Sequence, residues 1–189
     1  DEARAGRWVS GTFGWWWRYE DGNYPTSTQL RIDGAIYRFN ARGYMVTGWV
    51  YEDGQWYYYG ASGGQSAGWV RVHGTWYYLD PLTGAMASGW TKVQGTWYYL
   101  SSSGAMRTGW VRDGSAWYYL TSSGALATGW QRVGSSWYYL SPDGGAMATG
   151  WLRDGDAWYY LTSSGAMTTG SRWIDGTRYV FDDEGRLMP

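Results

Sequence analysis

A tandem repeat with a period of 20 or 21 residues constrains this chain more than any other feature of its sequence. The dipeptide Gly-Trp begins each full unit, and a second Trp follows the first one seven residues later. A fixed period of this kind predicts a repeat architecture, in which no single unit buries its own apolar face and the units must stack. The six Trp pairs are Trp49 and Trp56, Trp69 and Trp76, Trp90 and Trp97, Trp110 and Trp117, Trp130 and Trp137, and Trp151 and Trp158.

Each unit has the pattern of a β-hairpin followed by a loop. Aromatic and β-branched residues flank a two-residue turn that contains Gly, which is the strongest local signal for a hairpin. Turns such as Asp53-Gly54 suit type I′, whereas Gly114-Ser115, with Gly one place earlier, suits type II′. A single hairpin is only marginally stable in water. We therefore expect an all-β solenoid of stacked hairpins.

The turn fixes a register within each hairpin. With His73-Gly74 as the turn, Trp69 pairs with Tyr78 and Arg71 pairs with Trp76. Side chains alternate between the two faces of a strand, so both Trp residues and the second Tyr of a unit share one face. We interpret the other face as packing between hairpins; in this unit it carries Val70, Val72, Tyr77 and Leu79.

The array has irregular ends. Residues 1–29 do not fit the repeat template, and we interpret them as an N-terminal cap. The hairpin array spans residues 30–189, with six full repeats over 48–169 and degenerate repeats over 30–47 and 170–189. In the first degenerate repeat Ile36 stands where later units have the second Trp. No complete binding site is therefore expected before Trp49.

Composition excludes several classes of function. The formal net charge is −1, so bulk charge favours neither nucleic acid nor an anionic membrane as a partner. No apolar run is long enough to insert into a membrane. The chain has no Cys, and its one His, His73, lies at a hairpin turn. With most Asp residues also in turns, we predict no enzyme, no metal site and no cofactor.

Aromatic residues make up 21% of the chain, with 17 Trp and 19 Tyr. Two Trp residues on one face, together with a Tyr of the next hairpin and a nearby Met or Leu, would form an aromatic cage. Such a cage suits a quaternary ammonium, which needs no hydrogen-bond partner. The alternative is that the rings only hold the solenoid together. We interpret the base opposite each second Trp as its cation–π partner; these bases are Arg71, Lys92, Arg112, Arg132 and Arg153.

The segments GWTKVQGTWYYLSSSGAMRTGW and GWVRDGSAWYYLTSSGALATGW resemble the choline-binding (cell-wall-binding) repeats of Gram-positive surface proteins and phage lysins. The resemblance covers about residues 30–181. It implies a left-handed β-solenoid of stacked hairpins with choline sites between consecutive hairpins. In that family each site uses two Trp of one hairpin, a Tyr of the next and often a Met of the connecting loop.

Carried over to this chain, the resemblance implies five aromatic trios. The expected trios are Trp49, Trp56 and Tyr78; Trp69, Trp76 and Tyr99; Trp90, Trp97 and Tyr119; Trp110, Trp117 and Tyr139; and Trp130, Trp137 and Tyr160. The expected loop residues, beginning with the second trio, are Met86, Met106, Leu126 and Met147. The first trio is followed by GGQSAG, which lacks a Met, and Trp151 and Trp158 meet Val180 where a Tyr is expected.

The resemblance further implies a non-catalytic module that is secreted and held at a bacterial cell wall. It would bind choline or phosphocholine groups of teichoic or lipoteichoic acid at several sites at once. Any catalytic or effector domain would lie outside these residues. Two alternatives stay open, because glucan-binding repeats look similar and exposed aromatic rings also stack on sugars. These are a carbohydrate-binding module and a structural or host-contact stalk.

Overall fold

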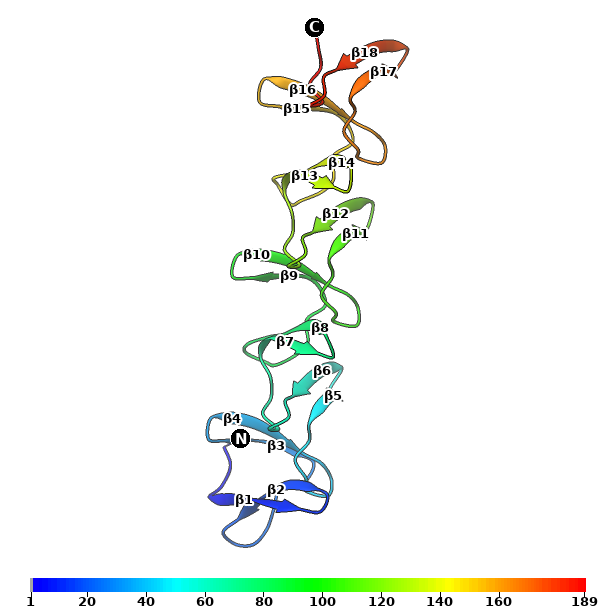
Figure 1. The fold of residues 1–189 in the computed structure, drawn as a ribbon. Helices are drawn as coiled ribbons and strands as arrows, with labels where there is room; N and C mark the ends of the chain where they lie inside the picture. Colours follow the sequence, from blue (N-terminus) through cyan, green and yellow to red (C-terminus); the bar gives the residue numbers. More distant parts are fainter. Residues whose placement is uncertain (1) are drawn as a thin grey trace. The chain divides into compact units, whose positions relative to one another are not determined.

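The computed structural model describes residues 2–189, which contain nine consecutive β-hairpins and no helix (Figure 1). The chain divides into two compact units. The first comprises Asp1–Gly89 and Leu100–Met106, and the second comprises Trp90–Tyr99 and Arg107–Pro189. The all-β fold of stacked hairpins predicted from the repeat is confirmed. The strands are β1 (Gly6–Gly11), β2 (Gly14–Tyr19), β3 (Thr28–Ile32), β4 (Ala35–Phe39), β5 (Gly48–Glu52), β6 (Gln55–Tyr59), β7 (Gly68–Val72), β8 (Thr75–Leu79), β9 (Gly89–Val93), β10 (Thr96–Leu100), β11 (Gly109–Asp113), β12 (Ala116–Leu120), β13 (Gly129–Val133), β14 (Ser136–Leu140), β15 (Gly150–Asp154), β16 (Ala157–Leu161), β17 (Gly170–Ile174) and β18 (Thr177–Phe181).

Strand pairing stays within each hairpin, where it has the predicted register. In β7 and β8, Trp69 lies opposite Tyr78 and Arg71 lies opposite Trp76. The turn residue His73 has a φ of 47° and is followed by Gly74 at 85°, as type I′ requires. In β11 to β12 only Gly114 is left-handed, with a φ of 58°, as in type II′. The turn type therefore varies while the pairing is constant.

The core includes a row of side chains, one at the end of the second strand in each hairpin from β3–β4 to β15–β16. These side chains lie on the face predicted to pack between hairpins, and each is completely buried. A fully buried Leu side chain contributes about 1.5–3 kcal/mol relative to an exposed one, so this row is a main source of stability. The completely buried residues are Phe39, Tyr59, Leu79, Leu100, Leu120, Leu140 and Leu161.

Each loop ties its hairpin to the preceding one. The backbone N–H of Met86, in the loop after β8, donates to the carbonyl of Trp56 in β6 at 2.8 Å. The next residue, Ala87, donates to the carbonyl of Tyr78 in its own hairpin. The same bond recurs from Met45, Met106, Leu126, Met147, Met167 and Leu187 to the second Trp of the preceding hairpin, at 2.6–2.8 Å.

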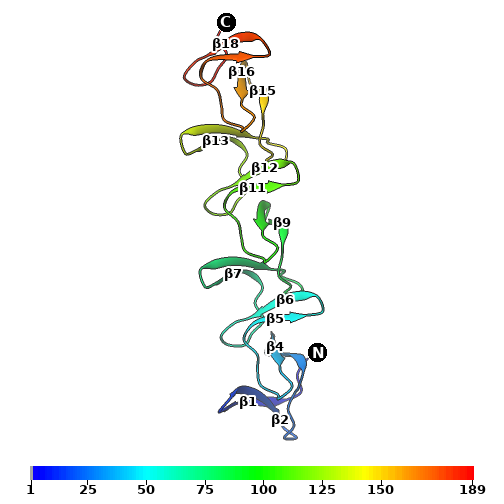
Figure 2. The same cartoon turned by 90° about the vertical axis from the view of Figure 1, so that its right-hand side faces the viewer.

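Successive hairpins point outward in different directions within a unit. In the first unit, for example, β3–β4 points to the left and β5–β6 to the right in Figure 1, and in the turned view of Figure 2 β5–β6 points to the right and β7 to the left. Only the loops link one hairpin to the next along the chain. The loop bonds therefore determine which side chains of neighbouring hairpins meet.

Residues 1–29, predicted to be an N-terminal cap that does not fit the repeat template, contain a hairpin that resembles the later ones. Strands β1 and β2 pair in the register of the later units, with Trp8 opposite Trp17 and Ser10 opposite Trp15. Trp8 and Trp15 are seven residues apart, and the carbonyl of Trp15 accepts the loop bond from Met45. Arg7 stands where the later units have Gly before the first Trp, so this unit does not match the Gly-Trp pattern of the repeat.

A polar junction occupies β3–β4 in place of an aromatic one. Gln29 stands at the position of the first Trp, and its side-chain amide donates to the hydroxyl of buried Tyr59 at 2.7 Å. Arg38 stands at the position of the second Tyr and forms an ion pair with Glu52 at 2.5 Å. Burial raises the pKa of Tyr59. This junction is thus held by hydrogen bonds and charge.

The buried row predicts a large difference between two neighbouring leucines. Leu79 is completely buried, whereas Leu82 is 95% exposed. Leu79→Ala leaves a cavity in the core and should lower the free energy of unfolding by about 2–5 kcal/mol. Leu82→Ala should change it by less than about 0.5 kcal/mol. Urea unfolding followed by Trp fluorescence measures both, and equal midpoints for the two variants would contradict this description of the core.

Candidate functional site: aromatic clefts between hairpins

The two Trp rings of one hairpin form two walls of a corner. In four hairpins their ring centroids lie 6.3–6.5 Å apart and their planes meet at 85–89°. The first Trp is half-buried in most units, whereas the second is 41–44% exposed. The second Trp therefore presents a ring face that other side chains leave open. Pairs with this geometry are Trp49 and Trp56, Trp69 and Trp76, Trp110 and Trp117, and Trp151 and Trp158.

At Trp49, Trp90, Trp110 and Trp130 the Tyr from the next hairpin is its first Tyr, whereas its second Tyr was predicted. Tyr77 lies 4.9 Å from Trp49, measured between ring centroids, and Tyr118, Tyr138 and Tyr159 take the same place beside Trp90, Trp110 and Trp130. The first Tyr lies on the Val/Tyr/Leu face, which is turned toward the preceding hairpin. The predicted residues Tyr78, Tyr99, Tyr119, Tyr139 and Tyr160 instead pack on the first Trp of their own hairpins at 5.0–5.2 Å.

The apolar loop residues also belong to other pairs than predicted. Met86 lines the cleft of Trp49 and Trp56, so this cleft has a Met although the GGQSAG loop of its own repeat lacks one. The loop folds back on the preceding hairpin, which moves every loop residue one site toward the N-terminus. Leu126 accordingly joins Trp90 and Trp97, and Met147 joins Trp110 and Trp117. Met106 bonds to the Trp76 carbonyl, and Met167, absent from the predicted set, lines the cleft of Trp130 and Trp137.

A third hairpin completes each cleft through the tip of its loop. Ser103 reaches the cleft of Trp49 and Trp56, and Ser163 and Ser164 reach the cleft of Trp110 and Trp117. Sequence reasoning placed each site between two hairpins and missed this contribution. The clefts enclose about 290 Å³ at Trp49, 380 Å³ at Trp90, 310 Å³ at Trp110 and 290 Å³ at Trp130.

The N-terminal hairpin carries a cleft of the same kind. Trp8 lies 4.8 Å from Tyr37, and the two residues line a cavity of about 280 Å³ with Trp15 and Met45. A cleft with two Trp, a Tyr and a Met thus precedes Trp49, where the sequence indicated no complete site. The seven-residue spacing of Trp8 and Trp15 was the signal in the sequence that could have revealed it.

The last Trp pair also has a Tyr neighbour. Tyr179 lies 4.8 Å from Trp151, whereas Val180, the residue expected there, is 40% exposed. The reason is the same as at the other pairs, because the first Tyr of a hairpin lies on the Val/Tyr/Leu face, which is turned toward the preceding hairpin. Leu187 donates its N–H to the Trp158 carbonyl, as the other loop residues do.

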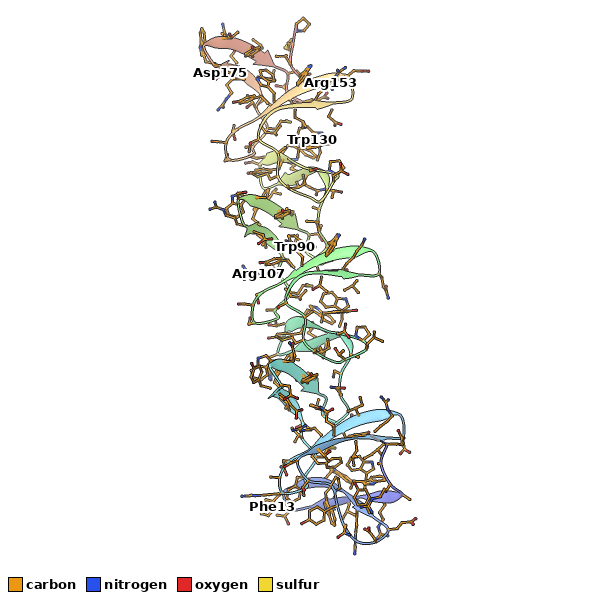
Figure 3. All side chains as sticks on the ribbon, turned by 180° about the vertical axis from the view of Figure 1, so that it is seen from behind. Phe13, Trp90, Arg107, Trp130, Arg153 and Asp175 are labelled. Atoms are coloured by element: carbon orange, nitrogen blue, oxygen red, sulfur yellow. The ribbon has the colours of Figure 1, made fainter. Side chains whose placement is uncertain are left out.

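Charged side chains contact several of the Trp rings. The cation–π interpretation is confirmed for Arg71, which lies 6.0 Å from the Trp76 ring, and for Lys92, which lies 5.7 Å from Trp97. Two aspartates that the sequence assigned to turns are the last residues of β11 and β15, and each bonds to the first Trp of the preceding hairpin; Figure 3 labels these Trp residues. The indole N–H groups of Trp90 and Trp130 donate to the carboxylates of Asp113 and Asp154 at 3.0 and 2.9 Å.

The described residues give no similar support for a metal site. Within residues 2–189, no group of three or more His, Cys, Asp or Glu side chains is placed to hold a metal ion. His73 lies in a hairpin turn. In the part of the chain that the structure describes, no helix has the length and apolar character needed to cross a membrane. The aromatic clefts are therefore the candidate functional sites.

Comparison with known families supports this choice. A family model described as a choline-binding repeat matches residues 26–67, 53–89, 87–128 and 127–169. A search of curated protein sequences found no significant match. The hairpin of Trp8 and Trp15 lies outside the matched residues.

Solved structures of pneumococcal proteins resemble most of this chain. Choline binding protein F from Streptococcus pneumoniae, crystallised in the presence of a peptidoglycan analogue, is 36% identical with a TM-score of 0.81. The alignment covers 93% of this chain and 61% of that one. CbpJ from S. pneumoniae is 29% identical with a TM-score of 0.78, covering 97% and 94% of the two chains. The modular autolysin LytC from S. pneumoniae is 34% identical with a TM-score of 0.71, covering 97% and 42%.

The cleft geometry predicts that two left-handed glycines respond differently to substitution. Gly165 and Gly170 have φ values of +82° and +70°, so Ala at either position should cost about 1 kcal/mol of stability from backbone strain. A Cβ at Gly165 would also overlap the Met147 side chain, whereas one at Gly170 would meet nothing within 4 Å. Gly165→Ala should therefore destabilise by about 1–3 kcal/mol more than Gly170→Ala in urea unfolding. Equal losses would show that the loop does not press on Met147.

Proposed function

Because this chain belongs to the choline-binding repeat family, we propose that it is a non-catalytic cell-wall-binding module that anchors to choline-bearing teichoic or lipoteichoic acid. One observation carries the proposal: open clefts recur along the array, each lined by two Trp, one Tyr and one Met or Leu. The ligand would be the choline or phosphocholine group of the polymer. The module would act at the surface of a Gram-positive cell.

The chemistry of the cleft fits a quaternary ammonium. Its positive charge is attracted to the electron-rich faces of the Trp and Tyr rings, by about 0.5–2 kcal/mol for each ring. Its methyl groups can pack on the same rings and on the flexible thioether of Met86 or Met147. The ammonium has no N–H to donate, so the cleft needs no acceptor at its centre. A Lys or Arg side chain would lose more hydration on entering.

Several weak sites would act together on one polymer. A single open cleft of this kind should bind with about millimolar affinity, or about 4 kcal/mol. Once one choline is bound, neighbouring cholines of the same chain are held at high effective concentration. We propose binding at the Trp8, Trp49, Trp90, Trp110 and Trp130 clefts. Trp69 with Trp76 stays a proposed site because its rings have the same geometry.

The relatives with known structures are longer than this chain. This chain spans 61% of choline binding protein F and 42% of the autolysin LytC. We propose that any catalytic or effector part of the full protein lies outside these residues. The repeats themselves would supply attachment to the cell wall.

A carbohydrate-binding module is the second candidate. The second Trp of each pair is 41–44% exposed, and a flat exposed ring can stack on a sugar ring. A sugar carries hydroxyl groups, however, and the clefts are lined mainly by rings and by a Met or Leu. Binding that depends on positive charge separates the two candidates.

Choline-dependent retention tests the proposal. The protein should be retained on a diethylaminoethyl matrix and released by choline at a concentration at which sodium chloride or the neutral isostere 3,3-dimethylbutanol does not release it. Release by sodium chloride at the same concentration would indicate plain ion exchange. Release by the neutral isostere, or retention on glucan that choline does not reverse, would contradict a cation-selective cage.

A single-cleft variant tests the assignment of the Tyr. Tyr138→Ala removes one wall of the Trp110 cleft and should lower the number of choline sites in a calorimetric titration by one. Tyr24→Ala is the control, because Tyr24 packs on Trp16 and lines none of the clefts described above. An unchanged number of sites in Tyr138→Ala would contradict the assignment.

A further inference from the structure

The clefts differ in charge. The Trp8, Trp49 and Trp110 clefts are lined at the loop tip by Ala or Ser residues. The Trp90 cleft includes the carboxylate of Asp113, and the Trp130 cleft includes those of Asp183 and Glu184. The aromatic frame is the same in all of them. The difference therefore lies in the rim, where the substituent of a bound ammonium would emerge.

Asp113 is fixed at the rim of the Trp90 cleft. One oxygen of its carboxylate, Oδ2, accepts the indole N–H of Trp90 at 3.0 Å, and the residue is exposed to solvent. Val133, the last residue of β13, occupies the corresponding strand position in the hairpin that follows Trp110 and Trp117. Both clefts also have a base paired with the second Trp, Lys92 in one and Arg112 in the other. The carboxylate of Asp113 is thus the charged group that distinguishes the Trp90 cleft from the Trp110 cleft.

The Trp130 cleft has a similar excess of negative charge. Asp154 accepts the indole N–H of Trp130, as Asp113 does for Trp90. At the loop tip, Asp183 and Glu184 occupy the positions that Ser163 and Ser164 occupy at the Trp110 cleft. Glu184 forms an ion pair with Arg186. Asp183 forms no hydrogen bond or ion pair within residues 2–189, so its charge is uncompensated.

We infer that the Trp90 and Trp130 clefts select a bare quaternary ammonium, whereas the Trp110 cleft accepts a phosphate ester of choline. The inference rests on the proposed function. A carboxylate near the cage attracts the ammonium but repels a phosphate that leaves the cage on the same side. At the Trp110 cleft the hydroxyl groups of Ser163 and Ser164 can donate hydrogen bonds to that phosphate instead. The array thus carries two classes of site.

Titration with choline and phosphocholine tests the inference cleft by cleft. The indole N–H signals of Trp90, Trp110 and Trp130 in nitrogen–proton NMR spectra report each cleft separately once they are assigned with Trp→Phe variants. In the wild-type protein the ratio of choline to phosphocholine affinity should be about threefold to tenfold higher at Trp90 and Trp130 than at Trp110, as expected for partly screened unit charges. Sodium chloride at about 0.5 M should reduce this difference.

Reciprocal substitutions at one loop position supply matched variants. Asp183→Ser should lower the choline preference at Trp130, and Ser163→Asp should raise it at Trp110, each by about threefold to tenfold. Both positions are exposed, so folding should be unaffected. Asp113→Asn keeps an acceptor for the Trp90 indole and should lower the preference at that cleft alone.

Two results would overturn the inference in distinguishable ways. If choline binds at all three clefts but the substitutions leave the ratio of affinities unchanged, the two classes do not exist and the proposed function stands. If neither ligand shifts any of the three indole signals, the proposed function fails together with the inference.

Discussion

The hydrogen bond from a loop N–H to the carbonyl of a Trp in the preceding hairpin determines the rest of this structure. Strands pair only inside hairpins, so the sheets themselves set no register between one hairpin and the next. The bond from Met86 to Trp56, and its equivalents at 2.6–2.8 Å, supply that register. Because the bond starts at the Met or Leu residue, it also carries that side chain to the cleft. A single backbone contact thus joins neighbouring hairpins and places one wall of the candidate site.

The two Trp residues of a pair differ in how far their rings are engaged in packing. Trp110 contacts a Tyr of its own hairpin at 5.1 Å and a Tyr of the next hairpin at 4.9 Å, so both of its sides are engaged. Trp117 is 41% exposed and keeps one ring face open. The interpretation of the rings as mere packing therefore describes the first Trp well and the second one poorly. The array gains stability and open aromatic surface from the same short repeat.

The hairpins could be predicted from the sequence, whereas the contacts between neighbouring hairpins could not. Alternation and turn chemistry are local, which is why the pairing of Trp69 with Tyr78 and both turn types could be predicted. The choice between Tyr77 and Tyr78 depends on which face of a hairpin meets its neighbour. Tyr77 lies on the face that was predicted to pack between hairpins, whereas the resemblance to the family indicated a Tyr on the Trp face. The direction of the loop, and with it the position of Met86, had no local signal.

The two lengths of the repeat show how the clefts can vary while their frame is kept. The loops 80–86 and 141–147 are one residue longer than the others, yet Met86 and Met147 make the same 2.8 Å bond to the preceding hairpin. The extra residue is absorbed at the loop tip, between the end of the strand and the Met. The loop tip is also where Ser103, Gly144 and Asp183 enter the clefts. Substitution or insertion there changes the rim of one cleft without moving its rings, so charge and size can be adjusted separately at each site.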